Sequence, residues 1–312
     1  MITSTANDRI RAIRALKRRK ERDERGLAYV EGIRSVLGAI ESGVDIALLL
    51  VAPDQLTSDR AREAVAAAEA TGVERIDVSR QVFESLSNRD GPQGIAAVIR
   101  QRWRALRSVE IEDGDRWVAL TAIQDPGNLG TILRTADAAG ATGVILLEVG
   151  ADPWDRTAMR ASTGAAFTQQ IVRADWKSFT EWAREAGATV VGSADTAETS
   201  YRGADYGPRT ILLMGSEREG LSETQQAFCD RLVAIPMRGS VDSLNLGVAA
   251  SLVLYEVMHQ REAGTAASTS EAPTTSDVPA PAAPASAIEA PAAPAASTKT
   301  DPASAASTTT EP

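Results

Sequence analysis

The sequence predicts an α/β protein built around a mostly parallel β-sheet. Two successive series of short apolar runs alternate with segments of helical character, which is the pattern of strands connected through helices. The apolar runs are compatible with strands that are buried on both faces, as in parallel sheets. A hydrophobic content of 43% and a charged content of 24% indicate a globular chain with enough apolar surface for a sizeable core.

The first series lies in residues 1–100 and predicts a small α/β domain. It begins with a basic segment, residues 8–25, that has the character of a helix. Strands are predicted after this segment at Leu27–Glu31, Ile46–Val51, Val73–Val78 and Ile95–Ile99. Helices are predicted between the strands at Gly32–Ser42, Arg60–Ala70 and Arg80–Ser87. Residues 101–115 are charged and show no clear periodicity, so we interpret them as a linker.

The second series lies in residues 116–262 and predicts the larger domain. Its strands are expected at Trp117–Ala122, Val144–Leu147, Thr189–Gly192, Thr210–Met214 and Leu232–Ile235. Its helices are expected at Leu129–Ala139, Asp155–Ala161, Trp176–Ala186, Ser222–Phe228 and Leu246–Met258. Ligands of such sheets bind at the carboxyl ends of the strands. Residues 263–312 are dominated by Ala, Pro, Ser and Thr, and they are expected to form a disordered tail because they cannot bury enough surface to offset chain entropy.

Cysteine content and apolar run length exclude several protein classes. A single cysteine, Cys229, excludes an intramolecular disulfide and any multi-cysteine metal site, and we expect no metal. The longest apolar run, Ile46–Ala52, is far too short to span a bilayer, so no membrane partner is expected. The polar, basic N-terminus has no apolar core of a signal peptide. We therefore expect a cytoplasmic protein.

The charge of the chain is distributed unevenly. The net charge is −9, but nine basic residues lie between Arg9 and Arg25, against three acidic ones. Such a dense, one-signed segment favours contact with nucleic-acid phosphates over a simply solvated helical face, which is the alternative. The residues proposed to bind RNA are Arg11, Arg14, Lys17, Arg18 and Arg19.

Three loops that follow predicted strands carry candidate functional residues. The first, residues 124–140, contains Asp-Pro-Gly-Asn and then Arg134 in a helix that is otherwise apolar on its inner face. The second, residues 213–222, places glycines on both sides of Ser-Glu-Arg-Glu. The third, residues 235–256, brings Ser243 and Asn245 to the start of an apolar helix, where both could simply be caps.

The common nucleotide-binding loops are absent from the sequence. Residues 127–130 lack the G-x-G-x-x-G spacing, and no G-x-x-x-x-G-K-[ST] motif occurs, so a nicotinamide dehydrogenase or a P-loop NTPase is disfavoured. The single histidine, His259, lies near the end of the last helix, where the helix dipole accounts for it. Histidine-based catalysis is therefore not expected.

The three loops together resemble the three signature motifs of the SpoU-type, TrmH-like RNA ribose 2′-O-methyltransferases of the SPOUT superfamily. The first loop matches through Asn128, Arg134 and Thr135-Ala136, and the second through Gly215-Ser-Glu217 and Gly220-Leu221. The third matches through Ile235-Pro-Met, Gly239-Ser-Val and Ser243-Leu-Asn245. Residues 29–36 are similar to the family's N-terminal RNA-binding domain, which is related to ribosomal proteins, whereas Pro92 stands where many members have histidine.

The resemblance implies a fold, a reaction and a set of residue roles. It implies a deep C-terminal trefoil knot, a homodimer, and methyl transfer from S-adenosylmethionine to a ribose 2′-hydroxyl. By motif position, Arg134 would act on the hydroxyl, and Asn128, Glu217, Ser243 and Asn245 would orient it and neighbouring groups. Backbone groups of Gly215, Ile235 and Leu244 would hold the adenosine part of the cofactor. Because a guanidinium normally stays protonated, Arg134 is better suited to stabilising an alkoxide or holding a phosphate than to acting as a base.

Three RNA-related functions fit these residues. Methylation of 23S rRNA is favoured, because the N-terminal domain and its basic arm suit a large folded RNA. Methylation of tRNA is an alternative within the same reaction class. A non-catalytic RNA-binding or ribosome-assembly factor is disfavoured, because all five predicted catalytic residues are present together.

Overall fold

The N-terminal lobe is a four-stranded sheet packed between two pairs of helices. The computed structural model describes residues 1–88 and 91–270 of the chain. The sheet order is β1 (Leu27–Glu31), β4 (Ile95–Arg100), β2 (Ile46–Val51) and β3 (Arg75–Asp77). Strand β4 is antiparallel to both of its neighbours, and β2 is parallel to β3. The helices are α1 (Asp8–Ala15), α2 (Arg19–Arg25), α3 (Ile33–Glu41), α4 (Asp59–Ala70) and α5 (Arg80–Leu86).

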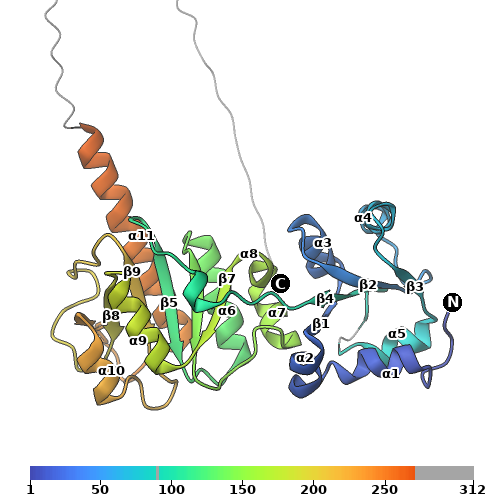
Figure 1. The fold of residues 1–312 in the computed structure, drawn as a ribbon, viewed down its shortest axis with the longest axis horizontal. Helices are drawn as coiled ribbons and strands as arrows, with labels where there is room; N and C mark the ends of the chain where they lie inside the picture. The colour runs from blue at the N-terminus through green and yellow to red at the C-terminus, as the bar shows by residue number, and fades with distance from the viewer. Residues whose placement is uncertain (89–90, 271–312) are drawn as a thin grey trace, which may run out of the picture. The chain divides into compact units, whose positions relative to one another are not determined.

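Alternating side chains of these strands feed two hydrophobic layers. On β2, Leu49 and Val51 face the layer that includes α3 and α4, whereas Leu48 and Leu50 face the layer that includes α1 and α5. The period of two is that of a strand whose two faces are both covered. Figure 1 shows α3 and α4 on one side of this sheet and α1 and α5 on the other.

The second lobe contains a fully parallel sheet of six strands. Its order is β10 (Arg231–Val233), β8 (Thr189–Ser193), β9 (Thr210–Met214), β5 (Arg116–Thr121), β6 (Gly143–Leu147) and β7 (Gln170–Ala174). All five neighbouring pairs are parallel. The helices of the lobe are α6 (Pro126–Ala138), α7 (Arg156–Ser162), α8 (Ala165–Thr168), α9 (Trp176–Glu185), α10 (Glu223–Phe228) and α11 (Leu246–Ser270).

Two cores cover the two faces of this sheet. Val118 and Leu120 of β5 face the core that contains α6 and α11, whereas Trp117 and Ala119 face the core that contains α9. Helices α6 and α11 are in direct contact, since the Thr135 and Ser251 hydroxyls lie 2.9 Å apart. The parallel sheet thus carries all its chain crossovers on covered faces, and its loops gather at the strand ends.

The predicted α/β fold with a mostly parallel sheet is confirmed, with several local corrections. Strand β7 was missed because it is an edge strand with only Ile171 and Val172 buried. The predicted helix over residues 8–25 is wrong as one element. It is two helices, because the chain turns at residues 16–18 where Leu16 is buried in the core.

The predicted linker and tail also have structure of their own. Residues 101–115 include a short 3-10 helix, η1 (Leu106–Ser108), and the Trp182 indole donates to the carbonyl of Val109 at 3.0 Å. Val109 and Ile111 are buried. Helix α11 runs to Ser270, past the tail boundary predicted at residue 263. The remainder of the predicted tail, residues 271–312, lies outside the described residues.

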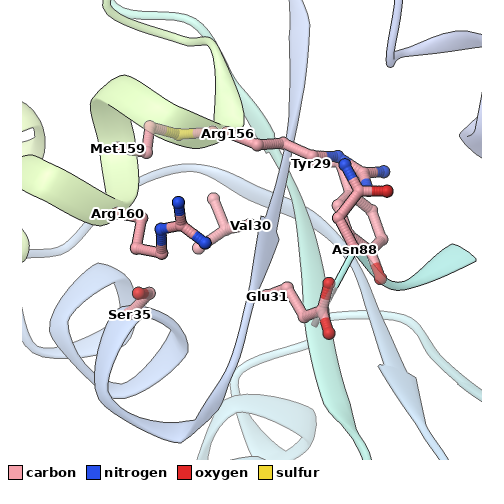
Figure 2. Close-up of a pocket in the computed structure, with 8 residues that line it drawn as sticks. All are labelled: Tyr29, Val30, Glu31, Ser35, Asn88, Arg156, Met159 and Arg160. Atoms are coloured by element: carbon pink, nitrogen blue, oxygen red, sulfur yellow. The ribbon is translucent and has the colours of Figure 1, made fainter. Parts of the chain in front are cut away.

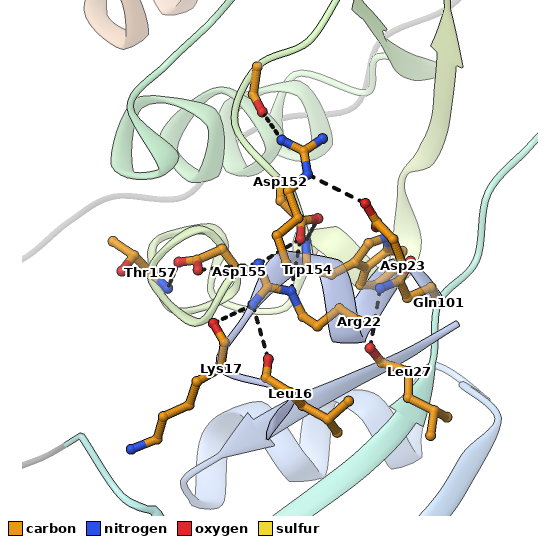
Figure 3. Close-up of polar contacts among 12 residues, drawn as sticks. Leu16, Lys17, Arg22, Asp23, Leu27, Gln101, Asp152, Trp154, Asp155 and Thr157 are labelled. Carbon is orange, nitrogen blue, oxygen red and sulfur yellow. Dashed lines mark hydrogen bonds and ion pairs between the residues drawn. The ribbon is translucent and has the colours of Figure 1, made fainter. Parts of the chain in front are cut away.

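A buried ion pair joins the two lobes. Arg22 of α2 donates to the Asp152 carboxylate through Nε at 2.8 Å and pairs with it through Nη2 at 2.7 Å. The Nη2 atom also lies 3.5 Å from the Asp155 carboxylate. Arg22 and Asp152 are 3% and 4% exposed, so this contact is shielded from salt (Figure 3). Nη1 donates to the carbonyls of Leu16 and Lys17, both at 3.0 Å.

A second contact between the lobes lies beside this pair. Arg19 of α2 donates through its Nη1 to the carbonyl of Gly150. Residues 1–269, which include both lobes, form one compact unit.

In the described part of the chain, no helix combines the length and apolar character needed to cross a membrane.

Removal of Arg22 is expected to destabilise the protein strongly. In Arg22→Ala the Asp152 carboxylate keeps its burial but loses its partner, which costs about 3–5 kcal/mol of unfolding free energy. The matched control is Arg25→Ala on the same helix, whose ion pair with Glu21 is partly exposed and is worth about 0–1 kcal/mol. Urea unfolding monitored by circular dichroism measures both variants. Equal losses in the two variants would contradict a structural role for the Arg22 pair.

Candidate functional site

The second lobe has a cavity at the carboxyl ends of strands β8, β9 and β10. Its volume is about 290 Å³. It is lined by the end of β8 and the residues after it, by the segment after β9, by the segment between β10 and α11, and by side chains of α10 and α11. The lining residues are Ser193, Ala194, Asp195, Met214, Gly215, Ser216, Glu217, Arg218, Glu219, Gly220, Leu221, Gln226, Ile235, Met237, Asp242, Ser243, Leu244, Leu246 and Ala249. Five of the eight predicted catalytic and cofactor-binding residues therefore line one cavity: Gly215, Glu217, Ile235, Ser243 and Leu244.

Gly215 is required by the tight hairpin that forms one wall of this cavity. Ser216 and Gly220 pair through two backbone hydrogen bonds of 3.0 and 3.1 Å, which fold the chain back on itself. A Cβ atom on Gly215 would lie 2.0 Å from the carbonyl carbon of Gly220. No side chain fits there, because the returning backbone of the hairpin at Gly220 and Leu221 fills the space.

The Glu217 carboxylate holds the loop that follows β5. It accepts hydrogen bonds from the backbone N–H of Gln124, at 3.2 Å to one oxygen, and of Asp125, at 3.2 Å to the other. It also accepts one from the side-chain amide of Asn128, at 3.5 Å. A carboxylate with several donors is well satisfied even where it is exposed. Glu217 therefore fixes the first signature loop against the second.

Asn128 connects this carboxylate to the third loop. The Asn245 side-chain amide donates to Asn128 Oδ1 at 2.8 Å. The side chain of Asn128 is available for this contact because Asp125 caps α6, accepting from the backbone N–H of Gly127 and Asn128. Asn128 therefore does not cap α6 but bridges Glu217 and Asn245.

Asn245 is both a helix cap and a member of this chain of contacts. Its Oδ1 accepts from the backbone N–H of Gly247 at 2.9 Å and of Val248 at 3.3 Å. Its Nδ2 remains free to reach Asn128, as described above. Ser243 is exposed on the cavity wall, while Ile235 and Leu244 are half-buried beside it. Ile235 lies beyond the end of β10, not within the strand as predicted.

Of the three predicted catalytic residues that do not line the cavity, Asn128 and Asn245 are connected to it through Glu217, whereas Arg134 is not. It lies on α6 beyond Asn128, is exposed, and forms no hydrogen bond or ion pair with another described residue. The next residue, Thr135, contacts Ser251 of α11. The guanidinium therefore lies at the solvent side of the α6–α11 contact, free to meet a ligand or another chain.

The predicted RNA-binding arginines and lysine divide into three groups. Arg11 and Arg18 pair with nearby acids of their own helices, Asp8 and Glu21. Arg14 and Lys17 face α5, where Arg14 donates to the Ser85 hydroxyl at 3.0 Å and Lys17 to the Asn88 amide oxygen at 3.2 Å. Arg19 reaches Gly150 of the second lobe, as described above.

The segment after β8 is the part of the cavity wall that the sequence interpretation missed. Ser193, Ala194 and Asp195 line the cavity immediately beyond that strand. The strand itself was predicted, and residues at the carboxyl ends of parallel strands are the expected ligand contacts. That rule alone would have pointed to Asp195. Within the described residues, no group of three or more His, Cys, Asp or Glu side chains could hold a metal ion.

Removal of the Asn245 amide is expected to destabilise the protein measurably. Asn245→Ala removes the cap of α11 and the bond to Asn128, at a cost of about 1–2 kcal/mol. Ser243→Ala is the matched control two residues away, because Ser243 is exposed and should change stability by less than about 0.5 kcal/mol. The unfolding free energies of the two variants are compared in urea. If Asn245→Ala has the unfolding free energy of the wild type, these hydrogen bonds do not contribute to stability.

Comparison with known proteins places this geometry in a family. The sequence profile of the SpoU rRNA Methylase family matches residues 115–255, and that of the MRM3-like substrate binding domain matches residues 7–97. A 23S rRNA (uridine(2479)-2′-O)-methyltransferase of Streptomyces viridochromogenes is 32% identical, over 81% of this chain and 90% of the relative. A 23S rRNA (guanosine-2′-O-)-methyltransferase RlmB of Coxiella burnetii is 35% identical, over 75% of this chain and 96% of the relative.

Solved structures agree with the sequence relatives. The AdoMet-bound rRNA methyltransferase of Sinorhizobium meliloti has a TM-score of 0.77 and 36% identity, covering 83% of this chain and 97% of its own. The SpoU methyltransferase AviRb of Streptomyces viridochromogenes, in complex with the cofactor AdoMet, has a TM-score of 0.75 and 32% identity, covering 82% of this chain and 98% of its own. The chain described here therefore belongs to the SpoU rRNA methylase family.

Proposed function

We propose that this protein is an S-adenosylmethionine-dependent methyltransferase that methylates a ribose 2′-hydroxyl in 23S rRNA. The observation that carries the proposal is the chain of contacts from Asn245 through Asn128 to Glu217, beside a cavity lined by Gly215 and Leu244. It joins residues of all three signature motifs in one place. Its relatives are named as enzymes of this reaction on 23S rRNA, and a relative of similar fold binds AdoMet.

The cavity suits the chemical groups of S-adenosylmethionine. Met214, Leu221 and Ile235 offer apolar surface for a flat adenine ring, and the hairpin of residues 215–220 lines the same cavity beside them. The carboxylates of Asp195 and Asp242 also line the cavity and suit the positive charge of the cofactor. Gly215, Ile235 and Leu244 would hold the adenosine part. When bound, the cofactor supplies an electrophilic methyl group on a sulfonium.

The residues of this chain orient the ribose and manage its proton. A 2′-hydroxyl is a weak nucleophile, so its orientation and the fate of its proton set the rate. Asn128 and Asn245 present amide groups beside the cavity, while Glu217 keeps Asn128 in place. Ser243 adds an exposed hydroxyl to the same wall. Arg134 stabilises the developing alkoxide or holds the neighbouring phosphate, because its guanidinium remains charged.

The active form in this proposal is a homodimer. Val248, Leu252 and Tyr255 of α11 are exposed by 46%, 38% and 46%, and their spacing places them on one face of the helix. Leu252 also borders an open groove of about 500 Å³ with Tyr201, Ile235 and Pro236. An exposed apolar face of this kind is typical of an interaction surface, and a second copy of the chain would bury it against an identical apolar face. The exposed Arg134, on neighbouring α6, would then lie near the partner.

The proposal includes a trefoil knot in the second lobe and a cytoplasmic location. The segment after β10 runs beside the long β8–β9 loop, since Ala234 and Tyr201 share a backbone hydrogen bond of 3.0 Å. The chain then continues to α11, which packs on α6 and whose Gln260 reaches back to the carbonyl of Arg202 in the same loop. The segment before α11 and the end of α11 thus both contact residues 201–202 of this loop, which supports threading of the chain. Cytoplasmic location follows from a ribosomal RNA substrate.

Loss of the Arg134 guanidinium is expected to abolish transfer without affecting the cofactor. Arg134→Ala should lower methyl transfer from labelled S-adenosylmethionine to 23S rRNA by about 100-fold or more. Calorimetric titration with S-adenosylmethionine should give an unchanged affinity, because Arg134 does not line the cavity. Arg60→Ala, an exposed arginine of α4, is the control for loss of a surface charge. Full activity of Arg134→Ala would remove this residue from the mechanism.

Mapping of the modified nucleotide distinguishes the possible substrates. Total RNA from cells with and without the gene is compared for ribose 2′-O-methylation. A site in 23S rRNA that is lost with the gene supports the proposal, whereas a lost site in tRNA would redirect it to that RNA. If this protein does not bind S-adenosylmethionine and transfers no methyl group, it is the non-catalytic RNA-binding or ribosome-assembly factor.

A charge on the exposed face of α11 is expected to separate the dimer. Leu252→Glu places a carboxylate in the centre of the apolar face, where burial against a second copy becomes unfavourable. Ala67→Glu, on an exposed position of α4, is the matched control. Sedimentation equilibrium should report a monomer for Leu252→Glu and a dimer for the control and the wild type. A wild-type monomer at micromolar concentration would overturn the dimer.

A further inference from the structure

A small cleft lies between the two lobes, away from the cofactor cavity. One side is formed by Tyr29, Val30 and Glu31 of β1 with Ser35 of α3, and the other by α7 (Figure 2). The α7 residues are Arg156, Met159 and Arg160, and Asn88 lies at the edge. The volume is about 50 Å³, which is enough for a group the size of a few water molecules, at roughly 10–15 Å³ for each.

Arg156 is held in this cleft with part of its hydrogen-bonding capacity unused. Its Nη1 donates to the carbonyl of Leu86 at 2.7 Å, and its guanidinium carbon lies 4.1 Å from the centre of the Tyr29 ring. Its Nε and Nη2 atoms are shielded from solvent and have no partner among the described residues. Burial lowers the pKa of this guanidinium. Glu31 and Asp155 act on Arg156 electrostatically without a hydrogen bond to it, so its two unpartnered nitrogens remain available to a ligand.

The groups around Arg156 make the cleft positive. Arg160 lies one turn further along α7, on the same side of the helix, and its guanidinium points into the cleft in Figure 2. Lys17, from the N-terminal arm, reaches Asn88 at the cleft edge. Burial and the charges of Arg156 and Arg14 lower the pKa of the Lys17 ammonium. The opposing acids are Glu31, whose carboxylate accepts from the Ser87 hydroxyl, and Asp155 at the start of α7.

We propose that Arg156 and Arg160 bind backbone phosphates of the substrate RNA at the cleft between the two lobes. This inference rests on the proposed function, and it extends the predicted basic segment, residues 8–25, across to the second lobe. Guanidinium groups form short, charge-assisted hydrogen bonds with phosphate oxygens. Arg156 lies against Tyr29 and Arg160 beside Val30, on opposite sides of β1, so the two arginines offer separate contacts for neighbouring phosphates (Figure 2). The Tyr29 ring is covered by Arg156, so the cleft offers charge in place of an aromatic surface for base stacking. The contact is therefore expected to be independent of sequence.

Salt-dependent RNA binding tests this site. Arg160→Gln removes an exposed charge, and Arg60→Gln removes a comparable exposed charge on α4 as the control. The probe is an in vitro transcript of 23S rRNA, titrated by filter binding at several KCl concentrations. Arg160→Gln should weaken binding about 10-fold at 0.1 M salt and should reduce the slope of log K against log [salt] by about 0.7–0.9. Arg60→Gln should leave both values at those of the wild type.

A second variant and a second readout keep the result interpretable. Arg156→Gln should lower RNA affinity in the same way, and its melting temperature shows whether it is folded. If Arg156→Gln is not folded, the binding measurements on Arg160→Gln alone test the proposal. Inorganic phosphate should compete with RNA less effectively in Arg160→Gln than in the wild type. Wild-type affinity and slope in Arg160→Gln would overturn the proposal.

Methyl transfer by the wild type separates this inference from the proposed function. A wild type that methylates 23S rRNA while Arg160→Gln binds RNA normally would contradict the cleft alone. A wild type that transfers no methyl group, but binds RNA in an Arg160-dependent, salt-sensitive way, would contradict the enzymatic function and support the cleft. S-adenosylmethionine affinity should be unchanged in Arg160→Gln, because Arg160 does not line the cofactor cavity.

Discussion

The arrangement of the loops around the cavity depends on the hydrogen bonds that the Glu217 carboxylate accepts. It lies just beyond β9, next to β5 in the sheet, and it accepts from two backbone N–H groups of the loop that follows β5. Through Asn128 it also connects to Asn245, which caps α11. Three loops that are far apart in sequence are thus fixed relative to one another by a few polar groups. The parallel sheet makes this possible, because it brings the carboxyl ends of β5 and β9 to one edge.

Local sequence patterns predicted the strands and the site loops but not how distant residues pair. Asn245 could be identified as a cap from its position before an apolar run, whereas its bond to Asn128 spans a separation of 117 residues. That Asp195 shares a cavity with residues after β9 and before α11 depends on the strand order β10-β8-β9-β5, which is not the order of the chain. Strand β7 has too few buried residues to be distinguished from a loop. Each of these features is set by tertiary packing, which periodicity does not contain.

The basic residues illustrate the same limit in electrostatic terms. A dense run of positive charge in residues 8–25 indicated phosphate binding, but it did not distinguish the individual side chains. Arg22 lies in this run and is nevertheless buried against Asp152, 130 residues away. Arg156 lies outside the run and yet lies close to Lys17 and Asn88 across the lobe boundary. A net charge of −9 therefore does not predict the charge of an RNA-binding surface, because the fold determines which charged side chains lie together on the surface.

Gly150 connects the N-terminal arm to the first signature loop. Its carbonyl accepts from Arg19 of α2, and a Cβ atom on Gly150 would lie 2.3 Å from the carbonyl oxygen of Ile123. The adjacent Ala151 N–H donates to that same oxygen at 2.6 Å, one residue before Gln124, which Glu217 holds. Arg19 of α2 and the loop held by Glu217 therefore contact the same short segment, residues 150 and 151. In the proposed function, this segment would connect RNA bound at the N-terminal lobe with the loop that orients the ribose.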